Sequence, residues 1–293
     1  MKNLMERTSR CTDTLRLLSL SAHLTDRDHR ILALLHEHRV LTTHQIVQVA
    51  FTSHSRAVQR MRTLTGLGVV ARFRPRRDRG SAPWHYVLDT LGAHVLAADR
   101  SGDVDRVRVR RDRQLAVAHS THLAHRVGAN GFFTALIGAA RARDGGAELG
   151  EWLNASDAAE WAEAHSREWG VRVPHPDGYG RWAENGRAVE FFLEWDTGTE
   201  THRQLTTKME RYVDFAQDAV RPVPWVLFVF PTPRRENGVR AVLRRVSGTG
   251  RLLVATTHLP LAETPHQAVW WPLGRSMGPQ RTPLADLAHA VER

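Results

Sequence analysis

The chain has little cysteine, little lysine and no long apolar run. Cys11 is its single cysteine, so no disulfide can form within the chain, which is typical of a protein in a reducing cytoplasm. The apolar runs are too short to span a bilayer. The run from 15 to 20 is also interrupted by Arg16 and Ser19, so it makes a poor signal-peptide core. We therefore expect a cytoplasmic, soluble protein with no membrane partner.

The positive charge is carried almost entirely by arginine. The 293 residues include 41 basic and 31 acidic side chains, which gives a net charge of +10. Such an excess favours a polyanion as partner, because binding releases the counterions that the polyanion holds. Only Lys2 and Lys208 are lysines, so an internal lysine is conspicuous. The length predicts two domains.

Residues 42 to 66 predict two consecutive helices. Thr42 and Gln45 form a capping box, flanked by apolar Leu41 and Ile46, and Ser53 is the expected cap of the second helix. The outer face of that second helix carries polar side chains suited to DNA, because arginine and glutamine pair with purine edges in the major groove. These side chains are Arg56, Gln59, Arg60, Arg62 and Thr63. A solvated helix face is the alternative.

The next segment predicts a hairpin with an arginine-rich tip. Two short apolar runs, at about 69–74 and 84–88, read as strands, and Gly80-Ser81 lets the connection turn. Its arginines are expected to contact DNA phosphates. They are Arg72, Arg74, Arg76, Arg77 and Arg79.

Helix, turn, helix and arginine-rich hairpin, in that order, resemble a winged helix-turn-helix module over residues 24–98. Thr25 and Asp28 predict the start of its supporting helix. The partner that the resemblance implies is double-stranded DNA, while a winged helix used for protein contacts explains the arginines less well. A helix starting at Asp89 or Thr90 either packs on the module or reaches a second copy, which leaves a homodimer open. Residues 1–23 are expected to be a basic arm and 99–113 a charged linker.

The second domain, residues 114–293, predicts a sheet with an acidic face. We expect a long helix over 115–143, a loop over 144–150, and a strand that runs into a turn at Asp177. In the next strand Glu194 and Asp196 share one face, since alternate side chains of a strand point the same way. Lys208 lies on the apolar stripe of the following helix. A buried charge needs a partner, and the acidic strand is where we expect it.

This arrangement resembles the PD-(D/E)xK nuclease superfamily, and so an α+β protein of two domains whose second has a mixed, restriction-endonuclease-like sheet. The resemblance implies that Asp177 and Glu194 hold Mg²⁺ or Mn²⁺, with Asp196 as an auxiliary ligand, and that Lys208 lies near the scissile phosphate. The chain departs from the family at Asp196, where the pattern has lysine. A structural salt bridge between Lys208 and Glu194 or Asp196 would give the same sequence pattern.

As a whole, the winged module, the histidine-rich helix and the stretch VEFFLEWDTGTE followed by residues 208–212 resemble the replication-relaxation family over about 24–230. The family implies a DNA-binding role in the replication or relaxation of plasmids and other mobile elements before transfer. Two alternatives stay open: a metal-dependent endonuclease or nickase, and a transcriptional regulator whose C-terminal part dimerises or senses a ligand.

Overall fold

The structure is a computed structural model that describes residues 23–76, 80–101, 116–168, 172–246, 252–274 and 280–290. The chain divides into two compact units, Met1–Leu123 and Ala124–Arg293. The expected basic arm up to residue 22, the charged linker from residue 102 and the arginines Arg77 and Arg79 lie outside the described residues. In the described part, no helix is both long and apolar enough to cross a membrane.

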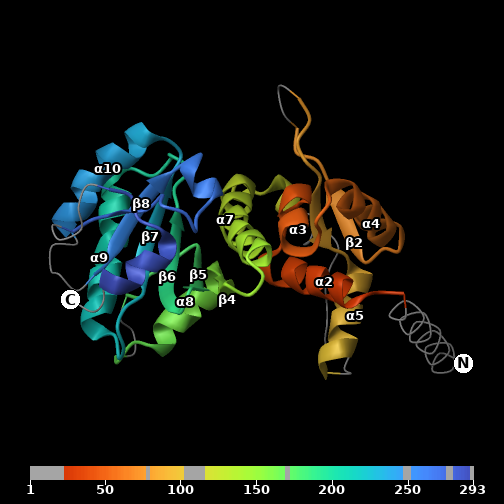
Figure 1. The fold of residues 1–293 in the computed structure, drawn as a ribbon, viewed down its shortest axis with the longest axis horizontal. Coiled ribbons are helices and arrows are strands. Elements are labelled where there is room, and N and C mark those ends of the chain that lie inside the picture. The colour runs from red at the N-terminus through yellow and green to blue at the C-terminus, as the bar shows by residue number, and fades with distance from the viewer. Residues whose placement is uncertain are drawn as a thin grey trace, which may run out of the picture. The chain divides into compact units, whose positions relative to one another are not determined.

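The first unit combines helices with a small antiparallel sheet (Figure 1). Strand β3 is central, with β1 and β2 on either side of it. In chain order its elements are α2 (Asp26–His38), β1 (Leu41–Thr42), α3 (Thr43–Ala50), α4 (His54–Gly66), β2 (Val70–Phe73), β3 (His85–Leu88), α5 (Thr90–Ser101) and the 3-10 turn η2 (Ala116–His119).

The helix starts of this unit follow local sequence signals. Thr25 and Asp28 form the predicted capping box of α2, and Thr42 and Gln45 form that of α3, each satisfying backbone N–H groups that a helix start leaves unpaired. Ser53 is the N-cap of α4 but makes no side-chain cap hydrogen bond. The start of α4 therefore depends more on the packing of its buried face than on a local cap.

Helix α5 packs on its own unit, against α2 and β2. Gly92 lies so close to the carbonyl oxygen of Val69 that no Cβ would fit between them. Packing on the rest of the first unit is one of the two alternatives that the sequence left open for this helix. The helix continues to Ser101, so the first residues assigned to a linker are helical.

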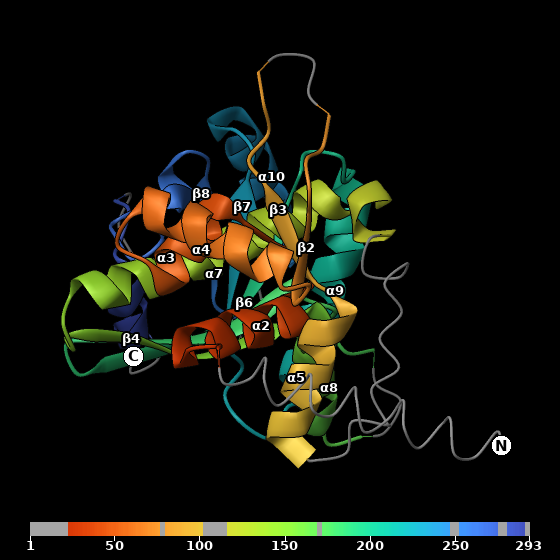
Figure 2. The same cartoon turned by 90° about the vertical axis from the view of Figure 1, so that its right-hand side faces the viewer.

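The second unit is a six-stranded mixed sheet with helices on both faces (Figures 1 and 2). The strand order is β4-β5-β6-β7-β8-β9, with β6, β7 and β8 parallel to one another and the remaining pairs antiparallel. Its elements are α7 (Leu123–Ala142), β4 (Ala147–Asn154), α8 (Ala155–Ala164), β5 (Gly178–Glu184), β6 (Arg187–Trp195), α9 (His202–Asp218), β7 (Trp225–Phe230), α10 (Pro233–Val246), β8 (Val254–His258), η3 (Leu261–Glu263), β9 (Trp271–Pro272) and η4 (Leu284–Ala290).

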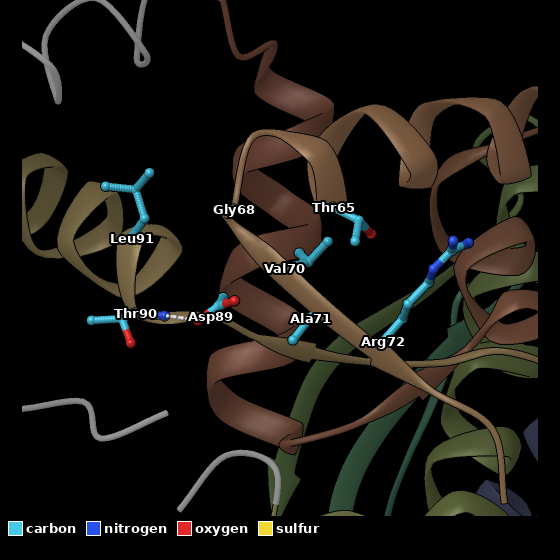
Figure 3. A pocket seen from close by; sticks show the side chains of 8 residues that line it. All are labelled: Thr65, Gly68, Val70, Ala71, Arg72, Asp89, Thr90 and Leu91. Carbon is cyan, nitrogen blue, oxygen red and sulfur yellow. Dashed lines mark hydrogen bonds between the residues drawn. The ribbon is translucent and has the colours of Figure 1, made fainter. Parts of the chain in front are cut away.

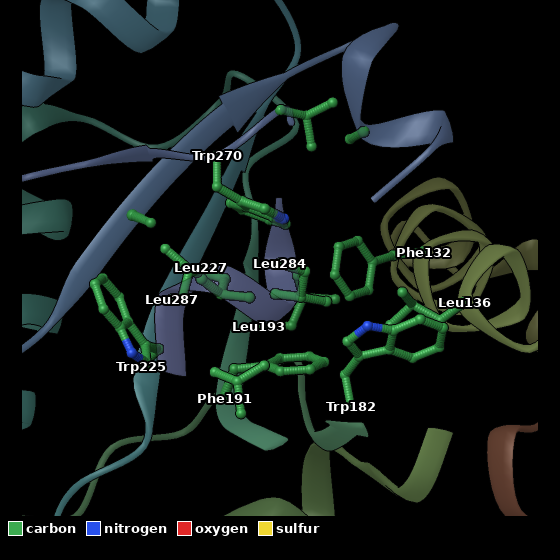
Figure 4. Packing of buried hydrophobic residues seen from close by; sticks show 14 of the residues in the cluster. Phe132, Leu136, Trp182, Phe191, Leu193, Trp225, Leu227, Trp270, Leu284 and Leu287 are labelled. Carbon is green, nitrogen blue, oxygen red and sulfur yellow. The ribbon is translucent and has the colours of Figure 1, made fainter. Parts of the chain in front are cut away.

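Each face of this sheet has its own apolar core. On one face, α7 and η4 pack against alternate residues of β6, including Phe191 and Leu193, as Figure 4 shows around Phe132 and Trp270. On the other face, Phe192 joins the core formed with α8, α9 and α10. The predicted alternation of β6 is confirmed, and it turns Glu194 toward α9.

The structure corrects the expected loop over 144–150. Strand β4 starts at Ala147 and pairs with β5, with a bulge at Gly150 between Leu149 and Glu151. The glycines there suggested a loop, but ladder hydrogen bonds to β5 hold this edge strand, and a glycine inside a strand often marks a bulge.

Two further element boundaries differ from expectation. Residues 172–177 form no strand, and β5 begins only at Gly178, because Pro174 and Pro176 have no N–H to donate to a ladder. The long helix expected from 115 starts instead at Leu123, after the separate turn η2. Asp177 therefore lies just before its strand rather than just after one.

Candidate functional site

Helix α4 exposes four of the five side chains predicted to read DNA. They are Arg56, Gln59, Arg62 and Thr63. The buried side of the helix is apolar, with Ala57, Met61 and Leu64 in the core. Among the described residues, neither Arg56 nor Arg62 has a carboxylate partner. Two guanidinium groups on this surface are therefore available to an anion.

Arg60, the fifth predicted side chain, is engaged within the unit. Its Nε and NH2 donate to the two carboxylate oxygens of Asp28, at 3.0 and 2.5 Å, and NH2 also donates to the carbonyl oxygen of His23. The Asp28 side chain is fully buried, so Arg60 supplies the countercharge that it needs. Arg60 is thus a structural link between α4 and α2, and its expected role in reading bases does not fit its position.

The hairpin β2–β3 carries the next arginines. The guanidinium carbons of Arg72 and Arg74 each lie 4.2 Å from the centroid of the Trp84 ring. Arg74 and Arg76 are exposed, and Arg72 is half-buried. The base of the hairpin therefore presents several cationic groups on one short segment.

A pocket lies beside this hairpin, where the end of α4, strand β2 and the start of α5 meet (Figure 3). Its polar groups serve the fold: Asp89 Oδ1 accepts a 2.7 Å hydrogen bond from Thr90 N, and Thr65 Oγ1 donates to Met61 O. Arg72 lines the pocket too, and Figure 3 shows its side chain directed away from Thr90.

In the second unit, the buried carboxylate of Glu194 is held by two side chains of α9. Lys208 Nζ donates to Glu194 Oε2 at 2.8 Å, and the Tyr212 hydroxyl donates to Oε1 at 2.6 Å. Lys208 also lies 2.9 Å from Glu200 Oε1. The inward-facing lysine thus meets the acidic face of the preceding strand, where the sequence indicated its partner.

Asp177 joins the same cluster and contacts His125, a pairing that the sequence did not predict. Its Oδ2 accepts a 2.7 Å hydrogen bond from the backbone N–H of Trp195, and its Oδ1 lies 2.7 Å from Nε2 of His125 in α7. One turn after His125, Gly128 packs directly against the Trp195 indole. A glycine inside a helix signals a close approach, but it does not say which partner approaches.

The cluster has perturbed acid–base properties. Burial raises the pKa of Glu194 to about 7, against the opposing effect of the Lys208 ammonium. Burial lowers the pKa of Lys208, but Glu194 and Asp177 raise it by more, so the lysine stays cationic. Burial lowers the pKa of His125, but the hydrogen bond that its imidazole donates to Asp177 and the charge of that carboxylate raise the pKa by more. The carboxyl group of Glu194 therefore holds its proton more strongly than an exposed glutamate does, while a cation stays beside it.

Asp196 is directed to different partners. Its Oδ2 accepts a 2.8 Å hydrogen bond from Nε of Arg235, and its Oδ1 accepts one from the backbone N–H of Gly198. The side chain is 1% exposed, and its two oxygens link α10, through Arg235, to the loop after β6 at Gly198. The expected role of Asp196 as an auxiliary metal ligand does not fit this arrangement.

The carboxylate oxygens of Asp177 and Glu194 are the groups of this cluster that could bind a divalent metal. Carboxylate oxygens are the right chemistry for Mg²⁺. However, every carboxylate oxygen of Asp177 and Glu194 already has a partner, and one of these partners is the Lys208 ammonium. Within the part of the chain that the structure describes, no group of three or more histidine, cysteine, aspartate or glutamate side chains could hold an ion. As arranged, these residues do not form a metal site.

The fold and these sites define a class of protein: an α+β chain in which an arginine-bearing helix and hairpin form one unit, and a mixed sheet with a carboxylate–lysine cluster forms the other. A family model described as replication-relaxation matches residues 32–223, about two thirds of the chain. The chain belongs to the replication-relaxation family, as its sequence indicated.

Similarity to solved structures is weak. Restriction endonuclease FokI bound to DNA matches with 14% identity and a TM-score of 0.27, covering 83% of this chain and 45% of that one. A second FokI structure matches with 13% identity and a TM-score of 0.28, covering 83% and 44%. This chain thus spans less than half of the matched FokI chains. No curated protein matches the chain.

Proposed function

We propose that the chain binds double-stranded DNA in the replication or relaxation of a plasmid or other mobile element. The first unit would choose the site as a winged helix-turn-helix module, and the second would act or assemble there. Membership of the replication-relaxation family supports the process. The net charge of +10 supports a polyanionic partner.

The order of elements in the first unit supports a winged helix. Helices α3 and α4 follow one another across a break of three residues, 51–53, and β2 and β3 form an antiparallel hairpin directly afterwards. In such modules the second helix of the pair enters the major groove. Here that helix is α4, whose outer surface is polar and cationic.

One observation carries the proposal: Arg56 and Arg62 are exposed on α4 and have no carboxylate partner among the described residues. A positive surface helix is often only solvated. Here the cationic helix adjoins a cationic hairpin within one compact unit, and together they offer contacts both to base edges and to phosphates.

The test starts by sequencing the DNA fragments that the full chain retains from its host replicon. Retained sites near an origin or a transfer region would support replication or mobilisation, and sites at promoters would favour the transcriptional regulator. Binding of the recovered duplex is then measured by fluorescence anisotropy across KCl concentrations.

In that assay Arg56→Ala is expected to cost about 1–3 kcal/mol on the recovered site and to relax its specificity, whereas Arg76→Ala should weaken all duplexes alike. Arg244→Ala, which removes an exposed arginine of α10, is the matched control. Wild-type affinity in Arg56→Ala, Arg62→Ala and Arg76→Ala together would refute this interface.

A metal-dependent endonuclease or nickase is the second candidate, favoured by the gathering of Asp177, Glu194 and Lys208. It would require Asp177 to release His125. The assay is nicking of supercoiled plasmid carrying the recovered site, with Mg²⁺ or Mn²⁺. Cleavage lost in Asp177→Ala and in Glu194→Ala, but kept in the exposed control Glu210→Ala, would support it; no metal-dependent product from the wild type would remove it.

A further inference from the structure

We infer that the Trp84 indole holds Arg72 and Arg74 together as a two-guanidinium clamp for the phosphate backbone of duplex DNA. This inference deepens the proposed function and rests on it. Trp84 would act as a positioning residue that touches no DNA itself, while the two arginines make the contacts.

The hairpin register brings the three side chains together. Phe73 of β2 pairs with His85 of β3, so one step further along these antiparallel chains Arg74 comes opposite Trp84. Arg72 lies two residues before Arg74 and therefore on the same face of the strand. Both guanidinium carbons are 4.2 Å from the centroid of the indole ring.

The backbone at Trp84 is anchored by a hydrogen bond. The carbonyl oxygen of Trp84 accepts a 2.9 Å hydrogen bond from the backbone N–H of Thr43, at the first residue of α3. On the neighbouring position, the rings of Phe73 and His85 stack with centroids 5.3 Å apart. The backbone of Trp84 is thus tied to the start of α3, and the indole meets the two arginines through the cation–π contacts.

The group carries two positive charges. Neither Arg72 nor Arg74 has a carboxylate partner among the described residues. Two guanidinium groups on one ring repel each other, and the negative face of the indole offsets only part of that repulsion. An anion that contacts both groups would supply the missing charge.

Stacking also leaves the right atoms available. A guanidinium group that lies on a ring uses its flat face, so its N–H groups remain at the edge, where they can donate to phosphate oxygens. Because the ring restricts the two long side chains before binding, less conformational entropy is lost when DNA binds. A repeating phosphate backbone suits a clamp of two adjacent donors better than a single free anion does.

The experiment uses the full chain and a fluorescein-labelled duplex of arbitrary sequence, titrated from about 50 to about 200 mM KCl. The variants are the double change Arg72→Gln with Arg74→Gln, the single changes Trp84→Leu and Trp84→Phe, and the control Arg244→Gln. Circular dichroism melting of each variant reports whether the unit remains folded.

We expect the double variant to lose two phosphate contacts, which lowers the slope of log K against log [KCl] by about 1.8. Its loss of affinity across that salt range would then be about 12-fold smaller than that of the wild type. Trp84→Leu should bind several-fold more weakly at constant salt, and Trp84→Phe should recover most of the affinity because it keeps an aromatic face. Arg244→Gln should keep the wild-type slope.

Two failures are distinguishable. If the wild type does not bind the duplex at any salt concentration, the proposed function fails and the clamp fails with it. If the wild type binds with a clear salt slope, but the double variant keeps that slope or Trp84→Leu keeps full affinity, the clamp alone is refuted. If Trp84→Leu fails to fold, the double arginine variant and Trp84→Phe still test the clamp. The clamp is refuted if the double variant has the same salt slope as the wild type, or if Trp84→Phe binds DNA no better than the double variant.

Discussion

Replacing Gly128 with alanine tests how closely α7 approaches the sheet. A Cβ built at Gly128 would have three atoms of the Trp195 indole within 2.7 Å. That is about 0.7 Å or more inside ordinary van der Waals contact, so the indole, the helix or both must move. His125 lies one turn earlier on the same helix and would move with it.

The magnitude follows from two opposing effects. Alanine in a helix interior is favoured over glycine by about 1 kcal/mol. Overpacking a closed contact costs about 1–3 kcal/mol. Gly238, in the interior of α10, provides the matched control, because nothing lies within 4 Å of its added Cβ. The helix preference cancels between the two variants, so Gly128→Ala should be less stable than Gly238→Ala by about 1–3 kcal/mol.

Chemical denaturation followed by circular dichroism measures this difference. A second readout is the imidazole NMR titration of His125: its pKa, which the hydrogen bond with Asp177 raises against the effect of burial, should fall when the helix is displaced. Equal or greater stability of Gly128→Ala relative to Gly238→Ala, together with an unchanged His125 titration, would refute the close packing of α7 on Trp195.

Two other predictions follow from buried charges. Arg60→Ala should lower the free energy of unfolding by about 1.5–3 kcal/mol, since buried Asp28 loses charged hydrogen bonds, yet leave the salt slope of DNA binding unchanged. Burial raises the pKa of Asp28, but Arg60 and Thr25 lower it by more, so this stabilisation is present above pH 3.8 and should vanish as the pH falls below that value. A difference in stability between the wild type and Arg60→Ala that stays constant down to pH 2 would contradict this prediction. Burial raises the pKa of Glu194 in the folded protein, so the wild type should lose stability as the pH rises from 4.5 to about 7. Glu194→Gln has no such proton to release, so its free energy of unfolding should rise relative to that of the wild type across this range. Parallel pH profiles of the two proteins in urea denaturation would exclude the effect.

Much of the secondary structure was predictable because its causes are local. The capping boxes at Thr25 and Thr42 involve residues three positions apart, and the alternation of β6 is a property of any strand with two different faces. The pairing of Lys208 with Glu194 was also predictable, because a buried ammonium needs a carboxylate and the preceding strand offers one.

What tertiary structure decided was which side chain meets which partner. Arg56 and Arg60 lie one turn apart on α4 and look equivalent in sequence, yet only Arg60 is within reach of Asp28 on α2. Likewise, the contact of His125 with Asp177 exists because Gly128 lets α7 approach Trp195, and β4 exists because β5 lies beside it. The sequence by itself therefore determined the helices, most of the strands and the chemistry available, through short-range hydrogen bonding and apolar periodicity. Packing between distant segments decided which charges are neutralised inside the protein and which remain on its surface.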